Sequence, residues 1–247
     1  MDIISSADNS LVKTVGKLKT RKYRYETGKF VLEGYRLVKD AVAREKSTEF
    51  KIILSQSNAA RYAGEFPQAV VLSDQLFDKL TDTVTSQGIM AIAPIAPFSE
   101  APKSSFCLYL DRIRDPGNLG TIIRSAAACG ITDIILDDCV DVYNPKTIRS
   151  SMSAYAHCDF ILATPSVTDG YSIVCADMNG EDIRSAALKI SGRPMCLVIG
   201  NEANGVSKEL LSRADAVVSL PMCKGVESLN AAVSASVAMY AFKYFIK

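Results

Sequence analysis

Short apolar runs alternate with segments of helical period over the second half of the chain. The apolar runs are nearly continuous, which is typical of strands that are buried on both faces. Predicted strands cover residues 106–113, 131–138, 159–164, 171–178, 195–200 and 216–222, and predicted helices cover residues 119–130, 144–157, 182–192, 206–214 and 228–247. This alternation predicts an α/β fold whose parallel sheet carries helices on both faces.

The first part of the chain alternates in the same way but less regularly. Helices are predicted over 9–18, 35–45 and 75–82, and strands over 30–34, 51–55, 69–73 and 88–93. These elements indicate a smaller α/β or α+β unit. Residues 93–105 contain three prolines and three serines and show neither helical nor strand periodicity. They therefore indicate a linker. We therefore divide the chain into residues 1–95, a linker at 96–105, and residues 106–247.

Composition places the chain among ordinary globular proteins. Its 247 residues are 48% apolar and 22% charged, which suffices for one large or two smaller cores. No run approaches the ~18 apolar residues of a membrane-spanning helix, and MDIISSADNS is unlike a secretory signal. The seven cysteines form no C-x-x-C pair, so we expect buried, reduced thiols in a cytoplasmic protein. His157 is the only histidine, which excludes zinc sites built from several histidines.

Basic residues gather near the start of the chain. Residues 1–98 carry 14 Lys+Arg and 11 Asp+Glu, whereas residues 99–247 carry 14 and 16. The excess lies beside Tyr23 and Tyr25, in Lys13, Lys17, Lys19, Arg21, Lys22 and Arg24. Such a stretch fits a polyanion partner such as RNA, and on its own it fits a solvated helix face equally well.

Three predicted strand exits share a composition rich in Gly, Asn, Glu and Ser. They are residues 115–124 (DPGNLGTIIR), 199–207 (IGNEANGVS) and 220–230 (LPMCKGVESLN). Parallel sheets bind ligands at the carboxyl ends of their strands, so the joint occurrence of these loops indicates a binding site. The chain lacks both G-x-G-x-x-G after a strand and G-x-x-x-x-G-K-[ST], which argues against an NAD-linked oxidoreductase and a P-loop NTPase.

The three exits resemble motifs 1, 2 and 3 of the SPOUT superfamily, in its SpoU/TrmH branch of RNA 2′-O-ribose methyltransferases. The matching positions are Asn118 and Arg124 in motif 1, Gly200, Asn201, Glu202 and Gly205 in motif 2, and Leu220–Met222 with Ser228–Asn230 in motif 3. The resemblance covers 106–247. Leu220 stands where isoleucine is commoner, and Ala231-Ala232 where Val-Ser is more usual; neither change removes a reactive group.

Residues 1–95 resemble the ribosomal-protein-like, L30e-type RNA-binding domain that often precedes this catalytic domain. FVLEGYRLVKDAV and SQGIMAIA carry that likeness. Together the two resemblances imply an α/β trefoil-knot (SPOUT) domain with a parallel sheet, plus a smaller L30e-like α/β domain. They further imply S-adenosylmethionine as cofactor, no metal, a homodimer with its site near the subunit interface, and RNA rather than DNA or membrane as partner.

The resemblance also implies roles for individual residues. The expected catalytic residues are Arg124, Asn118, Glu202, Ser228 and Asn230, the cofactor-binding residues are Gly200, Leu220 and Leu229, and the RNA-binding residues are Lys13, Lys17, Lys19, Arg21, Lys22 and Arg24. Two roles for Arg124 stay open. It either acts as a base after desolvation, or it stays charged, grips a phosphate and stabilises a developing alkoxide. Arg112, Arg114 and Lys224 flank the motif loops and are weaker candidates for phosphate contacts.

The expected function is methyl transfer from S-adenosylmethionine to a ribose 2′-hydroxyl, with large-subunit (23S) ribosomal RNA as the favoured target. The alternatives are a tRNA 2′-O-methyltransferase and a non-catalytic RNA-binding protein of the same fold. A degenerate binding protein should have lost Asn118, Arg124 or Glu202, and all three are present.

Overall fold

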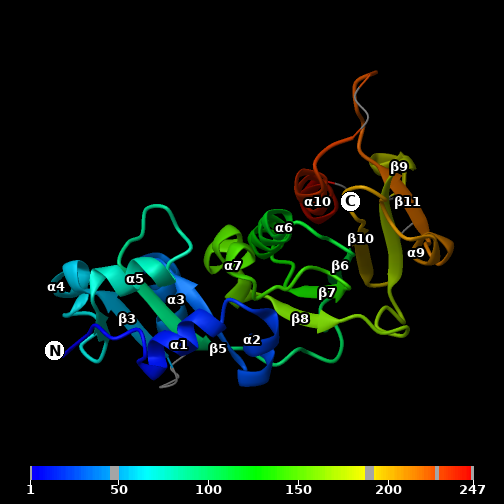
Figure 1. Cartoon of the computed structure of the whole chain (residues 1–247). Coiled ribbons are helices and arrows are strands. Elements are labelled where there is room, and N and C mark those ends of the chain that lie inside the picture. The colour runs from blue at the N-terminus through cyan, green and yellow to red at the C-terminus, as the bar shows by residue number, and fades with distance from the viewer. Residues whose placement is uncertain (1, 45–49, 187–191, 226–227, 246–247) are drawn as a thin grey trace. The chain divides into compact units, whose positions relative to one another are not determined.

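The computed structural model describes residues 2–44, 50–186, 192–225 and 228–245 (Figure 1). Two compact units emerge from the contacts between Cα atoms. The first contains Met1–Pro97 and Tyr143–Ser153, and the second contains Phe98–Val142 and Ala154–Lys247. Each unit has its own sheet and its own core, and each is described by itself below.

A six-stranded sheet forms the centre of the second unit. All of its neighbouring strands are parallel, in the order β11-β9-β10-β6-β7-β8. The strands are β6 (Phe106–Asp111), β7 (Asp133–Asp137), β8 (Asp159–Leu162), β9 (Ser172–Asp182), β10 (Met195–Ile199) and β11 (Ala216–Ser219). The predicted parallel α/β sheet is therefore confirmed, and its strand exits lie along one edge.

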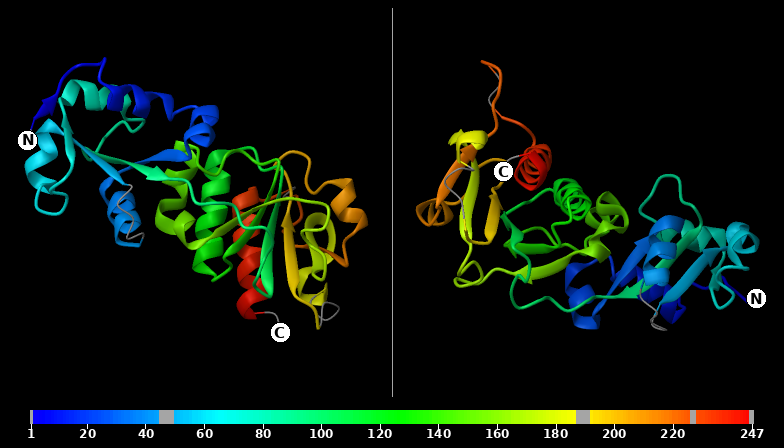
Figure 2. Two further views of the ribbon diagram at one scale, coloured as in Figure 1. Left: turned by 90° about the horizontal axis from the view of Figure 1, so that it is seen from below. Right: turned by 180° about the vertical axis from the view of Figure 1, so that it is seen from behind.

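Helices cover both faces of this sheet (Figures 1 and 2). They are α6 (Pro116–Ala128), the single-turn α8 (Ile183–Ala186), α9 (Lys208–Ser212) and α10 (Ala231–Tyr240). Helices α6 and α10 pack side by side, and the Ser236 hydroxyl donates to Ser125 Oγ at 2.7 Å. On the opposite face, Leu210 of α9 packs into a core with Tyr109, Cys175 and other strand side chains. Because both faces are buried, the strands are apolar at nearly every position.

Capping residues set the ends of these helices. The Asp115 side chain accepts a hydrogen bond from Asn118 N, and Pro116 occupies the first turn of α6. Gly130, at φ +71°, follows the helix in the left-handed conformation that glycine tolerates. The Asn230 side chain caps α10 by accepting from the backbone N–H groups of Ala232 and Val233.

Several helices differ from the sequence-based predictions. Helix α6 begins at Pro116 instead of at residue 119, and α9 covers Lys208–Ser212 instead of 206–214. The last helix begins at Ala231, after its Asn230 cap, instead of at residue 228, and it continues as a π-helix over Ala241–Phe245. The predicted helix 144–157 is α7 (Pro145–Ser151) followed by a 3₁₀ helix, η2 (Met152–His157). Met152 has φ +54°, which ends the α-helical conformation. The helix predicted over 182–192 lies partly in residues 187–191, outside the described residues.

A mixed five-stranded sheet forms the centre of the first unit, in the order β1-β4-β3-β5-β2. Its strands are β1 (Ile3–Ile4), β2 (Lys29–Glu33), β3 (Lys51–Ser55), β4 (Val70–Leu72) and β5 (Ile89–Pro94). Its helices are α1 (Ser10–Lys17), α2 (Arg21–Thr27), α3 (Tyr35–Arg44), the short η1 (Gln56–Asn58), α4 (Ala59–Tyr62) and α5 (Asp74–Leu80). Strand β1 and the helices α2 and α4 were not predicted from the sequence.

Helix α7 belongs to the first unit, although it follows the second unit's β7 in sequence. Tyr143, just before the helix, packs on Phe30 of β2 with ring centroids 4.8 Å apart. The Arg149 guanidinium lies 3.7 Å from the Glu33 carboxylate, and the Ser153 hydroxyl donates to Asp40 Oδ2 at 2.5 Å. Residues 143–153 thus complete a core whose other members come from the first 97 residues.

All seven cysteines are free thiols, and they differ in burial. Cys107, Cys129, Cys175 and Cys196 are buried, as expected. Cys223 is exposed, because it lies in the loop after β11 and outside the core. The expectation of buried thiols is therefore wrong for Cys223.

Arg24 is enclosed within the first unit, with 2% of its surface exposed. Its guanidinium donates to the backbone carbonyls of Leu18 and Lys19, at 2.8 and 2.9 Å. These bonds satisfy carbonyl groups at the C-terminal end of α1, which the helix itself leaves without donors. Arg24 therefore fastens α1 to α2, and it cannot contact a phosphate as its place in the basic stretch suggested.

We expect Arg24→Ala to lower the free energy of unfolding by about 2–4 kcal/mol, because it removes two hydrogen bonds and leaves buried carbonyls without donors. Urea unfolding of the full chain measures this loss. Lys22→Ala is the matched control, since Lys22 is exposed and forms an ion pair with Glu26 across the helix surface; its cost should stay within about 0.5 kcal/mol. Equal stability of the two variants would contradict a structural role for Arg24.

Candidate functional site

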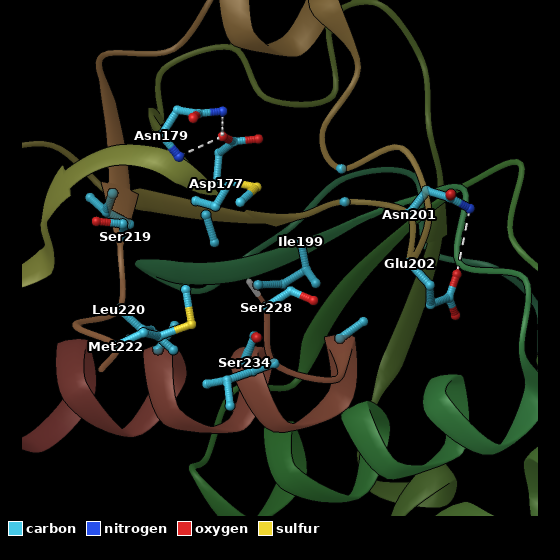
Figure 3. A pocket seen from close by; sticks show the side chains of 18 of the residues that line it. Asp177, Asn179, Ile199, Asn201, Glu202, Ser219, Leu220, Met222, Ser228 and Ser234 are labelled. Atoms are coloured by element: carbon cyan, nitrogen blue, oxygen red, sulfur yellow. Dashed lines mark hydrogen bonds between the residues drawn. The ribbon is translucent and has the colours of Figure 1, made fainter. Parts of the chain in front are cut away.

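A cavity of about 440 Å³ opens at the carboxyl edge of the parallel sheet (Figure 3). Its walls come from the ends of β9, β10 and β11 and from the start of α10. The lining residues used below are Asp177, Asn179, Ile199, Gly200, Asn201, Glu202, Gly205, Ser219, Leu220, Met222, Ser228, Leu229 and Ser234. Apolar and polar groups are mixed in this lining, as in sites for small organic ligands.

The loop after β10 folds back on itself within seven residues. Asn201 and Gly205 exchange backbone hydrogen bonds of 3.0 and 2.9 Å, and Asn201 Oδ1 accepts from the N–H groups of Ala203 and Asn204. A Cβ atom on Gly200 would lie 2.2 Å from backbone atoms of Gly205 and Val206. Gly200 is therefore required because the returning loop approaches it closely.

The Glu202 carboxylate joins two of the three motif loops. It accepts hydrogen bonds from Asn118 Nδ2 at 3.0 Å and from the backbone N–H groups of Asp115 and Arg114 at 3.2 and 3.3 Å. The third loop joins through Asn230, whose Nδ2 donates to Asn118 Oδ1 at 3.0 Å. The Asn118 amide is thereby fixed at both ends.

These contacts decide the charge state of Glu202. Burial acts to raise the pKa of the carboxyl group, but the hydrogen bond from Asn118 and those from the backbone N–H groups outweigh it. The net effect holds the pKa of Glu202 below its ordinary value, so the side chain is ionised at neutral pH. A charged acceptor strengthens each of the hydrogen bonds that it receives.

Asp111, the last residue of β6, stabilises the loops at the carboxyl edge of the sheet. Its carboxylate has 1% of its surface exposed, and it accepts from Ser207 N at 2.6 Å and from Arg112 Nε at 2.6 Å. Arg112 has φ +57°, a conformation that costs a non-glycine residue about 1–2 kcal/mol. In this conformation its carbonyl accepts from Asn201 Nδ2 at 2.8 Å. Arg112 and Asp111 therefore hold the loop after β10 against the end of β6.

Arg124 lies apart from the cavity. It is exposed on α6, six residues after Asn118, which corresponds to about 9 Å along the helix axis. It does not line the cavity and has no hydrogen-bond or ion-pair partner among the described residues. Within one chain, the structure brings Asn118, Glu202 and Asn230 together and leaves Arg124 outside their network.

The remaining predicted residues of the second unit lie as follows. Gly200, Leu220, Leu229 and Ser228 line the cavity, and Ser228 and Leu229 are exposed. Arg114 forms an ion pair with Asp138, and Lys224 is exposed in the loop after β11. His157 is exposed and does not line the cavity.

Asp177 and Asn179 line the cavity but escaped the sequence analysis. They follow the apolar start of β9, as the three recognised motifs follow their strands. The rule that ligands bind at the carboxyl ends of parallel strands would have pointed to them. No familiar motif marks this fourth exit, so the sequence pattern alone does not single it out.

The predicted RNA-contacting residues of the first unit, Arg24 excepted, are exposed. Lys13, Lys19 and Lys22 pair with Asp8, Asp82 and Glu26, respectively. Lys17 lies over the Tyr23 ring and Arg21 over the Tyr25 ring, 5.5 and 5.7 Å from the ring centroids. Lys17 and Arg21, which lie over aromatic rings, therefore supply the positive charge that is not offset by a neighbouring carboxylate.

Among the described residues there is neither a cluster of metal ligands nor a helix that could span a membrane. No group of three or more His, Cys, Asp or Glu side chains is arranged to hold a metal ion there. Every helix in that part of the chain is too short or too polar to cross a membrane.

Two family models match the chain. The model of the SpoU rRNA Methylase family matches residues 105–240, and that of the MRM3-like substrate binding domain matches residues 9–91. The first match contains the parallel sheet and all the residues that line the cavity. The second lies within the first unit.

Relatives match nearly the full length. The chain is 31% identical to the 23S rRNA (guanosine(2553)-2′-O)-methyltransferase RlmP of Bacillus subtilis, over 97% of this chain and 98% of that protein. It is 29% identical to the mouse mitochondrial rRNA methyltransferase 3, over 94% of this chain and 71% of that protein. The crystal structure of an AdoMet-bound rRNA methyltransferase from Sinorhizobium meliloti aligns with a TM-score of 0.81 and 27% identity, covering 100% of this chain and 99% of that one.

We expect Gly200→Ala to lower the free energy of unfolding of the second unit by about 2–4 kcal/mol, because the new methyl group meets backbone that cannot rotate away. Urea unfolding measures the loss, and amide exchange over 201–207 should accelerate. Gly170→Ala is the control, since a Cβ there meets nothing within 4 Å but φ is +85°; its cost should be about 1 kcal/mol. If Gly200→Ala unfolds no more easily than Gly170→Ala, the close approach is not what requires glycine.

Proposed function

The chain belongs to the SpoU rRNA methylase family, and from this premise we propose that it transfers the methyl group of S-adenosylmethionine to a ribose 2′-hydroxyl of large-subunit ribosomal RNA. One observation carries the proposal: a cavity of about 440 Å³ adjoins the network of Asn118, Glu202 and Asn230. A ligand pocket and a polar network from all three motifs thus meet at one edge of the sheet.

The cavity suits the methyl donor. Its volume lies within the ~300–1,000 Å³ of small-molecule pockets, and it combines apolar walls at Ile199, Leu220 and Met222 with polar groups such as Ser219 and Ser228. S-adenosylmethionine, when bound, supplies an electrophilic methyl group on a positively charged sulfur. We assign Gly200, Leu220 and Leu229 to the adenosine half, which they contact through backbone groups and apolar side chains.

The three polar side chains of the network position the reaction. Glu202 already accepts hydrogen bonds from four donors, so we propose that it orients the loops and does not take a proton itself. Asn118 and Asn230 are joined by a hydrogen bond between their side-chain amides. We propose that the amide donors and acceptors left over bind the RNA ribose. Ser228, on the cavity wall, contributes a hydroxyl that can bind the same ribose.

Arg124 is proposed to act across a dimer interface. It is exposed and outside its own chain's cavity, beside a helix, α10, whose outer surface is apolar. Val233, Val237 and Tyr240 there are 48%, 46% and 38% exposed. A second copy packed on this surface would bury those side chains and bring Arg124 to the partner's cavity. There the charged guanidinium grips an RNA phosphate and stabilises the developing alkoxide, the second of its two possible roles.

RNA binding is proposed for the first unit, which contains the match to the MRM3-like substrate binding domain. Lys17 and Arg21, each held over a tyrosine, offer charge for phosphates and rings for unpaired bases. Residues 1–95 would thus form the RNA-binding domain, and residues 106–247 would form the knotted catalytic domain. Residues 96–105 would be the linker between these two domains. Helix α7 is the exception, because it packs in the first unit. A cytoplasmic location is part of the same proposal.

The function is tested by transfer of tritiated methyl groups from S-adenosylmethionine to separate pools of ribosomal RNA and tRNA, both from cells that lack the gene. We expect alkali-resistant 2′-O-methyl dinucleotides from the ribosomal pool. Arg124→Ala should reduce transfer by at least about 100-fold, while the affinity for S-adenosylhomocysteine stays within about twofold, because the proposed partner of Arg124 is the RNA phosphate and not the methyl donor.

Label confined to tRNA would replace ribosomal RNA with tRNA as the substrate. Binding of the donor without transfer to either pool would contradict catalysis on these free RNAs. If the donor does not bind at all, the enzyme proposal fails and an RNA-binding protein of the same fold remains.

The dimer is tested by mixing two inactive variants, Arg124→Ala and Glu202→Gln. If Arg124 serves the partner's cavity, each mixed dimer holds one intact site, and an equilibrated mixture should recover about a quarter of the wild-type rate. If Arg124 acts in its own chain, no mixed dimer has an intact site and the mixture stays inactive. Sedimentation of each variant alone checks that both still form dimers.

A further inference from the structure

We propose that Asp177 binds the ribose 2′- and 3′-hydroxyls of the methyl donor, as the residue that recognises the sugar of the adenosine half. This inference rests on the proposed function, because it assigns a part of the same cavity. It starts from the fourth strand exit, at β9, which none of the three motifs includes.

Strand register places Asp177 beside Gly200. Ala176 of β9 and Ile199 of β10 form the last pair of the parallel ladder between these strands. Asp177 and Gly200, the next residue of each strand, are therefore neighbours just beyond the end of that ladder. The pairing of β9 with β11 then shifts, from Val217↔Cys175 to Val218↔Glu181. Residues 177–180 therefore bulge out of the ladder that β9 forms with β10 and β11, and bulges of this kind redirect side chains beside active sites. Asp177 and Asn179 both line the cavity as a result.

One oxygen of the Asp177 carboxylate is fixed and the other is available. Oδ1 accepts from the Asn179 backbone N–H at 2.9 Å and from Asn179 Nδ2 at 3.1 Å, which sets the plane of the carboxylate (Figure 3). Oδ2 faces Gly205, where a Cβ atom would lie only 3.2 Å from it. No donor among the described residues bonds Oδ2, so it can accept hydrogen bonds from a ligand. A hydroxyl pair supplies two such donors.

The order of strands across the sheet edge assigns the sugar to this position. Leu220 follows β11, Asp177 lies on β9, Gly200 follows β10, and Asn118 lies beyond β6, in the order β11-β9-β10-β6. In Figure 3, Asp177 lies on the upper wall of the cavity, across from Leu220 and Ser234, with Glu202 to its right. A ligand with its adenine at Leu220 and its methyl group at the Asn118–Glu202 network must lay its ribose between them. Asp177 is the carboxylate on the cavity wall at that point.

General chemistry supports the same assignment. In dinucleotide-binding α/β folds, an acidic residue near the end of a neighbouring strand accepts hydrogen bonds from ribose hydroxyls. The acidic Glu202 on this cavity wall already accepts hydrogen bonds from the side chains of Asn118 and Asn201 and from two backbone N–H groups. Asp177 therefore supplies the acceptor that the sugar requires.

The test is calorimetric titration of the full-length protein with three ligands: S-adenosylhomocysteine, 5′-methylthioadenosine, and the 2′,3′-dideoxy form of 5′-methylthioadenosine. The variants are Asp177→Ala and Asp177→Asn, with Glu209→Gln as control, because Glu209 is exposed on α9 and does not line the cavity. Thermal unfolding of each variant confirms that it folds.

We expect Asp177→Ala to weaken S-adenosylhomocysteine and 5′-methylthioadenosine by the same factor, about 10- to 100-fold, since a hydrogen bond to a charged group is lost. The wild type should bind the dideoxy ligand correspondingly more weakly, and Asp177→Ala should bind both thio-nucleosides alike. Asp177→Asn should fall between the wild type and Asp177→Ala, and Glu209→Gln should match the wild type.

Two results would overturn the assignment. If only S-adenosylhomocysteine is weakened, Asp177 contacts the amino-acid end, which 5′-methylthioadenosine lacks. If loss of the hydroxyls weakens binding as much in Asp177→Ala as in the wild type, the carboxylate does not contact them. Failure of the wild type to bind S-adenosylhomocysteine would instead refute the proposed function, so the two failures are distinguishable.

Discussion

The site depends on the carboxylate of Glu202 and on the donors that converge on it. Loops that leave different strands of a parallel sheet share no backbone ladder, so only side-chain contacts can fix them against one another. Glu202 joins the loop after β10 to the loop after β6, and the Asn118–Asn230 bond adds the loop after β11. Because the carboxylate is charged, each hydrogen bond that it accepts is stronger than one to a neutral acceptor.

The sheet makes this convergence possible. Its strands run in one direction and are covered on both faces, so all their carboxyl ends open on one edge, where the polar motif loops gather. Two backbone features then bring the loops within bonding distance. Gly200 lets the loop after β10 return against its own strand, and the left-handed Arg112 turns its carbonyl toward Asn201. The cost in conformational energy at Arg112 is offset by the buried Asp111, which binds both Arg112 and Ser207.

Periodicity predicted most of the strands, because burial on both faces leaves a continuous apolar run that few other structures produce. Local chemistry predicted caps such as Gly130, and the family motifs predicted that Asn118, Glu202 and Asn230 belong together. Contacts distant in sequence were not predictable. In the sequence, Arg24 is one of several basic residues in a row and looks like a surface charge. In the structure it is buried and donates hydrogen bonds to the carbonyls of Leu18 and Lys19. The bulge that turns Asp177 into the cavity depends on the pairing of β9 with β11, which no local pattern in the sequence records. Nor does helical spacing reveal that Arg124 lies outside its own chain's cavity.

The insertion of residues 143–153 into the first unit has a consequence for how the chain is made. The core around Phe30 lacks Tyr143, and Glu33 lacks Arg149, until more than half of the protein has been synthesised. The first unit is therefore first in sequence but not independent in folding, and the two units are bound by three chain crossings instead of a single linker. A recombinant fragment ending at residue 97 would expose an apolar strand face that the native protein never presents to water. Exchange of RNA-binding modules between relatives of this architecture would have to carry α7 with the module, which couples the evolution of the two units.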